Sequence, residues 1–151
     1  MIPVITTADG SALRWVSCLR YLGCHFVSGR QFSVSFDLSK RSFCRAVNGI
    51  IGKIGKSTHE DVVLHLIKFK CLPMLLYATE CCNVNKRSLA SLDFCVVKFV
   101  MKIFKSTNRL LIDECMNNFG FSLPSKLIVA RLERFMLKIK SCTNSLVVRY
   151  R

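Results

Sequence analysis

A glycine-rich segment is the first candidate for chemistry, because it superficially resembles a loop that binds nucleotide phosphates. Residues 49–58 read GIIGKIGKST. A phosphate-binding loop has the spacing G-x-x-x-x-G-K-[ST] and follows a buried strand. Here one residue too many separates Gly49 from Gly55, and the apolar residues before Gly49 recur at helical spacing. The segment therefore does not predict nucleotide hydrolysis, and we expect no cofactor.

Thiols and imidazoles are the next candidates, because they could hold zinc or act as nucleophiles. The chain has nine cysteines and no Cys-x-x-Cys pair. Cys18, Cys24 and His25 lie close in sequence, but no second pair of ligands accompanies them. The odd count and the adjacent Cys81 and Cys82 indicate free thiols that behave as small apolar residues in a reducing compartment. We expect no metal and an intracellular location, nuclear or cytoplasmic.

Two rows of cations are the third candidate. At helical spacing the sequence places Lys98, Lys102 and Lys105 in one row, and Arg131, Arg134 and Lys138 in another. Cations on one side of a helix can follow a row of phosphates, although a solvated helix face is the ordinary alternative. The chain has 23 Lys and Arg but only 9 Asp and Glu, a formal net charge of +14. This excess favours a polyanionic partner, so we predict that both rows bind nucleic acid.

The apolar segments are too short or too interrupted to place the chain in a membrane. In the richest of them, Val62 to Ala78, His65, Lys68 and Lys70 interrupt the run. A membrane-spanning helix needs roughly 20 consecutive apolar residues. Met1 to Gly10 also lack the basic start and long apolar segment of a secretion signal. We therefore expect neither a membrane span nor export.

The first third of the chain predicts a small β element over residues 1–36. Short segments rich in β-forming residues occupy 2–6, 13–16 and 19–27, and residues 8–11 form a turn between the first two. From Asp37 onward the apolar spacing changes from two residues to three or four, which is typical of helices. The predicted fold is mainly α, with the β element followed by a bundle of about five helices over 37–142 and a tail over 143–151.

Capping and breaking residues predict where the helices begin and end. Asp37, Thr58, Asn85 and Asn108 are suited to cap the first four helices, and Pro124 suits the first turn of the fifth. Pro73 should end or kink the second helix, and Gly120 should stop the fourth. The first helix runs into three glycines, Gly49, Gly52 and Gly55, each of which costs up to about 1 kcal/mol relative to alanine.

Apolar periodicity predicts which sides of the helices are buried. The second helix is apolar on most sides and should form the centre of the core. The inner side of the first helix should hold Phe43, Val47, Ile50 and Ile54. That of the third should hold Leu89, Leu92, Val96, Phe99 and Ile103, and that of the fifth Ile128, Leu132, Phe135 and Ile139.

Several segments in order resemble one family. Arg20-Tyr21-Leu22-Gly23-Cys24 resembles the Tyr-Leu-Gly strand that follows the palm catalytic core in reverse transcriptases of non-LTR (LINE-type) retrotransposons. Residues 71–77, CLPMLLY, resemble the Leu-Pro then Tyr signature of the family's thumb, and 89–104 resemble its next long helix. The resemblance covers about residues 11–106, and the order of these segments makes it specific.

The resemblance implies a role in holding nucleic acid rather than in catalysis. The β element would be the hairpin that supports the primer end, with Tyr21, Leu22 and Gly23 in it, and the helices would be the thumb. The partners would be an RNA/DNA or DNA duplex and the palm domain of the parent polymerase. The chain has no aromatic-x-Asp-Asp motif, and two-metal phosphoryl transfer requires such carboxylates. We therefore predict a fragment that is inactive alone.

Two other functions remain open on the sequence. A free-standing basic helical adaptor for an acidic protein or a membrane surface would also explain the charge, although a cationic amphipathic helix with exposed aromatic residues is not evident. A metal or thiol enzyme is the third alternative. The order of the motifs favours the polymerase thumb.

Overall fold

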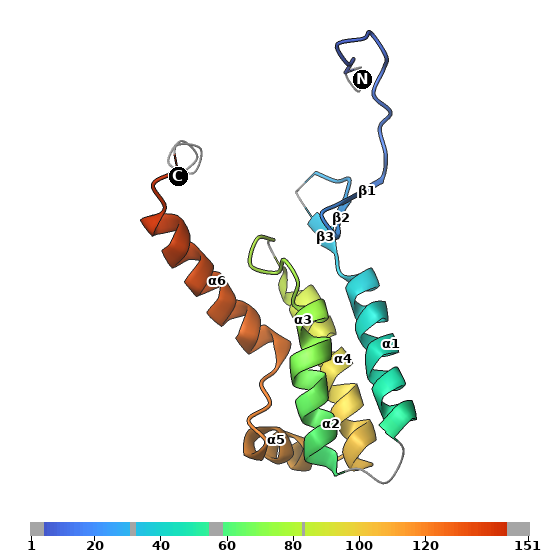
Figure 1. Ribbon diagram of the computed structural model, residues 1–151, viewed down its shortest axis with the longest axis vertical. Helices are drawn as coiled ribbons and strands as arrows, with labels where there is room; N and C mark the ends of the chain where they lie inside the picture. The colour runs from blue at the N-terminus through green and yellow to red at the C-terminus, as the bar shows by residue number, and fades with distance from the viewer. Residues whose placement is uncertain (1–4, 31–32, 55–58, 83, 145–151) are drawn as a thin grey trace. The chain divides into compact units, whose positions relative to one another are not determined.

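The computed structural model describes residues 5–30, 33–54, 59–82 and 84–144. The chain divides into two compact units, Met1–Ser35 and Phe36–Arg151. In the described residues the first unit contains a three-stranded antiparallel sheet (Figure 1). Those of the second unit contain five helices, one of which consists of three consecutive elements. This architecture confirms the predicted fold class.

The sheet of the first unit, here called the β unit, is built around a tight hairpin. Its strands β1 (Cys18–Tyr21), β2 (Cys24–Val27) and β3 (Ser33–Ser35) pair in that order. Tyr21 pairs with Cys24, so Leu22 and Gly23 form a two-residue turn with φ angles of 46° and 81°. Positive φ at both central residues matches the twist of the flanking strands. The expected single strand over 19–27 is therefore wrong, because this turn divides it.

The segment before the hairpin contains less strand than the sequence predicts. The predicted turn over 8–11 is present: Gly10 has a φ of 78°, and its N–H donates to the Thr7 carbonyl at 3.0 Å. Around it only Thr6 and Ala12 form a bridge. The predicted strand over 13–16 is wrong, and the predicted strand over 2–6 lies partly outside the described residues. An isolated pair of strands is marginally stable in water, which explains why this segment pairs so little.

The β unit has no hydrophobic core in its described part. None of residues 5–30 and 33–35 is buried. Trp15 is 59% exposed and Leu19 is 55% exposed, although both are large apolar side chains. Backbone pairing and the turn therefore hold this sheet together, with little contribution from burial.

The second unit, here called the helical unit, begins with α1 (Asp37–Ile54). Its Phe43 and Val47 are fully buried, and Ile50 and Ile54 are partly covered, as the periodicity predicts. Gly49 and Gly52 lie in the helix, and a Cβ at either would meet nothing within 4 Å. The predicted cap Thr58 and the third glycine, Gly55, lie outside the described residues.

The second helical element changes its hydrogen-bonding register along its length. It consists of α2 (Glu60–Leu66), the π-helical turn η2 (Ile67–Cys71) and α3 (Leu72–Leu75). The Leu72 N–H donates to the Ile67 carbonyl, five residues back. The π turn ends two residues before Pro73, which has no N–H to continue the α-helical ladder. The predicted disturbance at Pro73 is therefore confirmed, and the helix ends two residues after it.

This second element also forms the centre of the core, as predicted. Ile67 and Leu75 are at most 2% exposed, and Leu92 of α4 (Lys86–Phe104) is fully buried. Phe43 of α1 and Phe99 of α4 meet edge to face, with ring centroids 5.7 Å apart. No helix in the described ranges is long and apolar enough to cross a membrane.

Asparagines cap α4 and α5 (Arg109–Asn118), as the sequence predicts. The side-chain oxygen of Asn85 accepts from the Ser88 N–H at 2.7 Å, and that of Asn108 accepts from the Leu110 N–H at 3.1 Å. Each bond satisfies a backbone donor that has no partner within the helix. Gly120, with a φ of 57°, follows the end of α5.

The last helix, α6 (Pro124–Ser141), begins where predicted but is buried over only part of its predicted inner side. Ile128 is 4% exposed, whereas Leu132 is 43% exposed, and Phe135 and Ile139 are only partly covered. The predicted burial of Leu132 is therefore wrong, and that of Phe135 and Ile139 is met only in part. The N-terminal turns pack on α4, and the helix then runs away from the others (Figure 1). In the described structure its C-terminal half is thus covered only in part.

Candidate nucleic-acid interface

Helices α1 and α4 lie side by side and run in the same direction. Near the start of both helices, the Lys40 ammonium donates to the Ser91 hydroxyl at 3.1 Å. Further along both, the Lys102 ammonium donates to the Asn48 side-chain oxygen at 3.1 Å. The first contact joins the early turns of the two helices, and the second joins their later turns. The two helices are therefore in contact along one continuous seam.

Cations from both helices border this seam. Arg41, Arg45 and Asn48 recur at four and three residues, so they share one side of α1. Asn48 bonds Lys102, and Lys98 lies one turn before Lys102 on α4. We call the set Arg41, Arg45, Lys98 and Lys102 the α1–α4 cation face. All four residues are exposed.

A thiol at the seam supports this placement of Lys98. Burial raises the pKa of the Cys95 thiol above its ordinary value, and the adjacent Cys44 of α1 adds to the rise. Positive charge on Lys40 and Lys98 acts in the opposite direction, because a cation favours the thiolate. Lys98 therefore lies close enough to the seam for its charge to act there.

The carboxylates of α1 and α4 do not neutralise the cation face. Asp37 is engaged by Lys40, with an N–O distance of 2.7 Å. Asp93 accepts from the Ser125 N–H at 2.8 Å, on the side of α4 that meets α6. Among the described residues no ion pair involves Arg41, Arg45, Lys98 or Lys102. Their positive charge is therefore available to an anion from solution.

The predicted row on α4 is exposed, and an aromatic side chain accompanies it. Lys98 and Lys102 lie in the helix, and Lys105 follows its end in the left-handed conformation, with a φ of 50°. Phe94, one turn before Lys98, is 67% exposed. An exposed ring beside cations can stack on an unpaired base, while the cations contact the backbone.

The predicted row on α6 is partly engaged within the fold. The Arg131 guanidinium donates to the Leu76 carbonyl at 3.1 Å and lies 4.0 Å from the Glu80 carboxylate. Arg134 donates to the Ala130 carbonyl of its own helix at 3.2 Å. Lys138 is exposed. Arg131 thus stabilises the end of α3, a role that helical spacing alone does not indicate.

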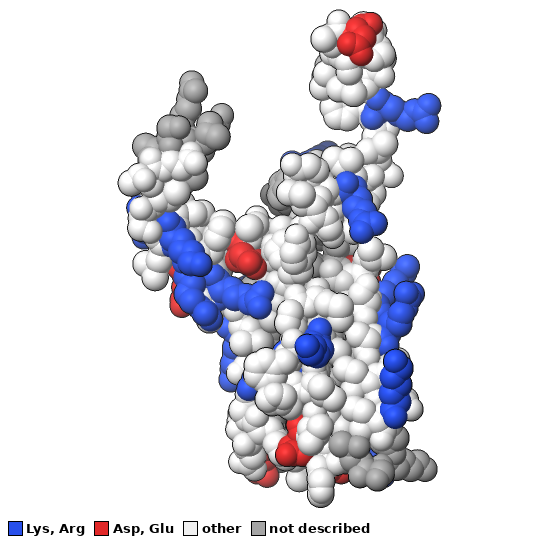
Figure 2. Space-filling model, in the orientation of Figure 1, with Lys and Arg blue, Asp and Glu red and all other residues white. Residues whose placement is uncertain are grey.

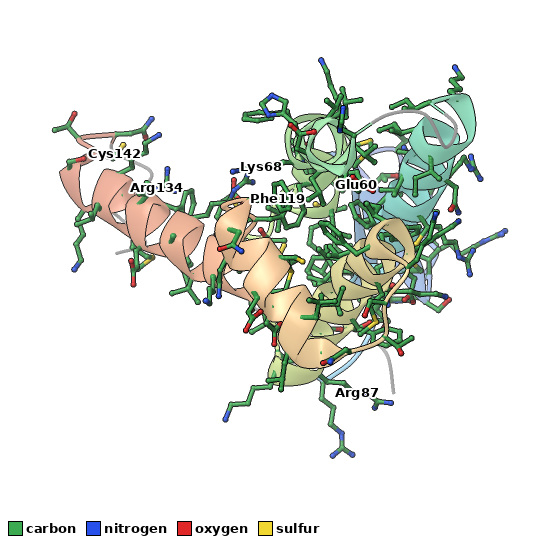
Figure 3. The ribbon with its side chains drawn as sticks, turned by 90° about the horizontal axis from the view of Figure 1, so that it is seen from below. Glu60, Lys68, Arg87, Phe119, Arg134 and Cys142 are labelled. Atoms are coloured by element: carbon green, nitrogen blue, oxygen red, sulfur yellow. The ribbon has the colours of Figure 1, made fainter. Side chains whose placement is uncertain are left out.

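The two predicted rows lie on different surfaces of the helical unit. Helix α4 meets α1 through Ser91 and Lys102, and it meets α6 through Asp93. Seen from below, α1 and α6 occupy opposite sides of the helical unit (Figure 3). Basic side chains gather along both of these helices (Figure 2). The two rows together would have suggested one cationic cleft. Because they lie on different surfaces, their six residues do not form one.

Sequence reasoning missed three residues of this interface. Arg41 and Arg45 lie four residues apart on the side of α1 away from buried Phe43, and that spacing was visible in the sequence. Phe94 falls outside the apolar stripe of α4, which indicates an exposed aromatic residue. No local signal showed that α1 would lie beside α4, because that contact depends on the packed core.

The β unit presents the residues of the predicted primer-grip segment at the tip of its hairpin. Tyr21 is 60% exposed and Leu22 is 72% exposed, and Gly23 completes the turn between β1 and β2. Both side chains are thus accessible to a ligand. The tight turn fixes their backbone.

The described residues offer little for metal or thiol chemistry. The Cys18 sulfur lies 3.9 Å from the His25 Nδ1, but in the described part of the chain no group of three His, Cys, Asp or Glu could hold a metal ion. Burial raises the pKa of the Cys71 thiol, which keeps it protonated and weakly nucleophilic.

Comparison with family models, curated proteins and solved structures finds no match to this chain.

Proposed function

We propose that this chain is the primer-grip and thumb portion of a non-LTR retrotransposon reverse transcriptase. It holds a primer/template duplex by its backbone and makes no bond itself. The observation that carries this proposal is the α1–α4 cation face, four exposed cations on two packed helices without carboxylate partners in the described structure. The order of the resembling segments, from the Tyr-Leu-Gly hairpin to the long α4, supports the choice of family.

Phosphate contacts suit such a role because they do not depend on base sequence. Arg and Lys fix the position of a duplex through its phosphates and leave the bases unread. A polymerase must hold every sequence that it copies, so this property is required. Helices α1 and α4 share a packed core that keeps the cations in register, and Phe94 adds a ring for a base beyond the duplex end. The hairpin with Tyr21 would support the primer end.

The proposal is tested by titrating the full chain with RNA/DNA hybrid duplex over a range of salt concentrations. A variant in which glutamine replaces Arg41, Arg45, Lys98 and Lys102 should bind at least about tenfold more weakly at low salt. If each residue contacts one phosphate, the log–log salt slope should become shallower by about 3.5. The loss should be similar for duplexes of unrelated sequence.

A matched control separates the location of the charges from their number. A second variant carries glutamine at four exposed cations elsewhere, Lys70, Lys86, Lys126 and Lys140. It loses the same formal charge and should keep most of the affinity and the salt slope. Equal losses in the two variants would show that binding is diffuse and would reject the α1–α4 cation face as the site.

A further inference from the structure

An apolar groove of about 550 Å³ lies between α6 and the segment that joins α3 to α4. Cys82, Val84 and Leu89 line one wall, and Val129, Leu132 and Met136 line the other. In α6 these three positions recur at three and four residues, so they form one stripe along the helix. The stripe is about 10 Å long at the rise of an α-helix.

The α6 wall of this groove is exposed although it is apolar. Val129 is 51% exposed, Leu132 is 43% exposed and Met136 is 46% exposed. Contiguous exposed apolar surface in a hollow, as opposed to single scattered residues, is typical of an interaction site. A second helix lying along the groove would bury this stripe. Its own apolar side chains would recur at positions i, i+3 and i+7, the usual spacing of a helix bound in a groove.

Cations edge the groove on one side. A second hollow, of about 290 Å³, is lined by Arg131, Arg134, Phe135 and Lys138 and shares Phe135 and Glu80 with the apolar groove. Arg131 lies 4.0 Å from Glu80 and offsets its charge. Within the described ranges no ion pair involves Arg134 or Lys138. The edge of the groove therefore has a positive charge that would attract acidic side chains.

We propose that this groove binds an amphipathic helix of another protein, with an apolar stripe and a flank of Glu or Asp. The apolar stripe would cover Leu132 and Met136, and the acidic flank would pair with Arg134 and Lys138. A second copy of the chain fits less well, because two α6 helices face to face would oppose these cations to one another. A flat anionic bilayer fits a concave groove poorly, since it cannot reach the inner wall at Leu89.

This inference assigns Arg134 and Lys138 to a protein partner, whereas the sequence predicts that they contact nucleic acid. It does not depend on the α1–α4 cation face, which lies on a different surface. The peptide site can therefore fail while the duplex site holds, and the reverse is equally possible.

The test uses the full chain and a fluorescent amphipathic peptide of roughly 18 residues, about five helical turns. The peptide carries leucines at alternating third and fourth positions and glutamates along one flank. Binding should be saturable, and the double variant Leu132→Ser with Met136→Ser should weaken it at least about tenfold. The double variant Arg134→Glu with Lys138→Glu should weaken it similarly, and it should also improve binding of a peptide with lysines in place of the glutamates.

Two control variants test whether the loss of peptide binding is specific to the groove. Leu110→Ser removes a leucine that is 76% exposed on α5, and Lys126→Glu reverses an exposed charge near the start of α6. Both should bind the glutamate peptide as the unaltered chain does. Circular dichroism should show the same helix content in all variants.

Three outcomes would overturn the inference. One is equal binding of the glutamate and lysine peptides to the unaltered chain. Another is binding to vesicles of phosphatidylserine and phosphatidylcholine without binding to the peptide, which would make α6 a membrane-surface helix. The third is a loss of duplex affinity on reversal of Arg134 and Lys138 with peptide binding intact, which would return these cations to the nucleic-acid site.

Discussion

The β unit and the helical unit treat their large apolar side chains differently. Leu19 in β1 is 55% exposed, whereas Leu75 in α3 is fully buried. The helical unit buries side chains from every one of its helices, while the described part of the β unit buries none. The first unit therefore depends on backbone pairing and a turn, and the second on a packed core.

The charged residues are also distributed unequally between the two units. Residues 36–151 contain 20 of the 23 Lys and Arg and 8 of the 9 Asp and Glu. The cations that could bind a polyanion thus lie on the helical unit. Its packed core fixes the spacing between them. The β unit offers exposed aromatic and apolar groups on a hairpin of low intrinsic stability. We infer that the helical unit would supply most of the affinity for a polyanion.

The largest test of this comparison is a pair of leucine truncations. Leu75→Ala should lower the free energy of unfolding by about 2–5 kcal/mol, because it leaves a cavity in the core. Leu19→Ala should change it by less than about 0.5 kcal/mol, because the side chain is already largely in water. Urea unfolding followed by helical circular dichroism gives the first value, and Trp15 fluorescence during the same unfolding gives the second. Equal losses would show that the two units share one core.

The next test compares two arginines. Arg131→Met removes the donor to the Leu76 carbonyl and the cation that lies 4.0 Å from Glu80, whose Oε2 is buried without a hydrogen-bond partner among the described residues. We expect a loss of about 1–2 kcal/mol in the helical unit. Arg20→Met in exposed β1 should change stability by less than about 0.5 kcal/mol. A negligible loss for Arg131→Met, measured by the same urea unfolding, would mean that this guanidinium is available to ligands after all.

Glycine replacements should act with opposite signs in the two units. Gly23→Ala places a Cβ at a φ of 81° and should destabilise the hairpin by about 1 kcal/mol. Gly52→Ala meets nothing within 4 Å on α1 and should stabilise the helical unit by about 0.5–1 kcal/mol. Trp15, the single tryptophan, reports the β unit by fluorescence, and circular dichroism reports the helices. If both replacements changed the free energy of unfolding in the same direction, the proposed difference between the two units would be contradicted.

Features that depend on a few neighbouring residues were predictable from the sequence. The asparagine caps at Asn85 and Asn108, the glycine after α5 and the disturbance at Pro73 each depend on the local chain. The cation row of α4 was likewise evident as helical spacing, and it supplies part of the candidate site.

Features that depend on distant neighbours were not predictable. The burial of Leu132 required a helix beyond α4 for α6 to pack on, and periodicity cannot show whether one exists. Arg131 fits the spacing of a binding row, yet its bond to Leu76 joins residues 55 positions apart. The contribution of Arg41 became visible only once Asn48 and Lys102 showed that α1 lies beside α4.

The smallest expected effect is a pH dependence that should belong to the helical unit. Burial raises the pKa of Cys71 above its ordinary value of 9.0. Above that pH the unfolded chain releases this proton while the folded chain still holds it, so rising pH favours unfolding. The stabilisation is complete below about pH 9 and is lost as pH rises through the folded pKa. Circular dichroism during urea unfolding should show this decline.

Cys71→Ala should flatten the decline, whatever its effect on stability at neutral pH. Cys95, whose pKa burial also raises, should leave a residual slope that Cys95→Ala removes. Exposed Cys18 in the β unit provides the matched control, since Cys18→Ala removes a thiol outside the helical unit and should keep the full slope. A free energy of unfolding that stays constant above pH 9 in the unaltered chain would mean that water reaches these thiols. The helical unit would then be less well packed than the burial of Cys71 indicates. The contrast with the coreless β unit would be weaker.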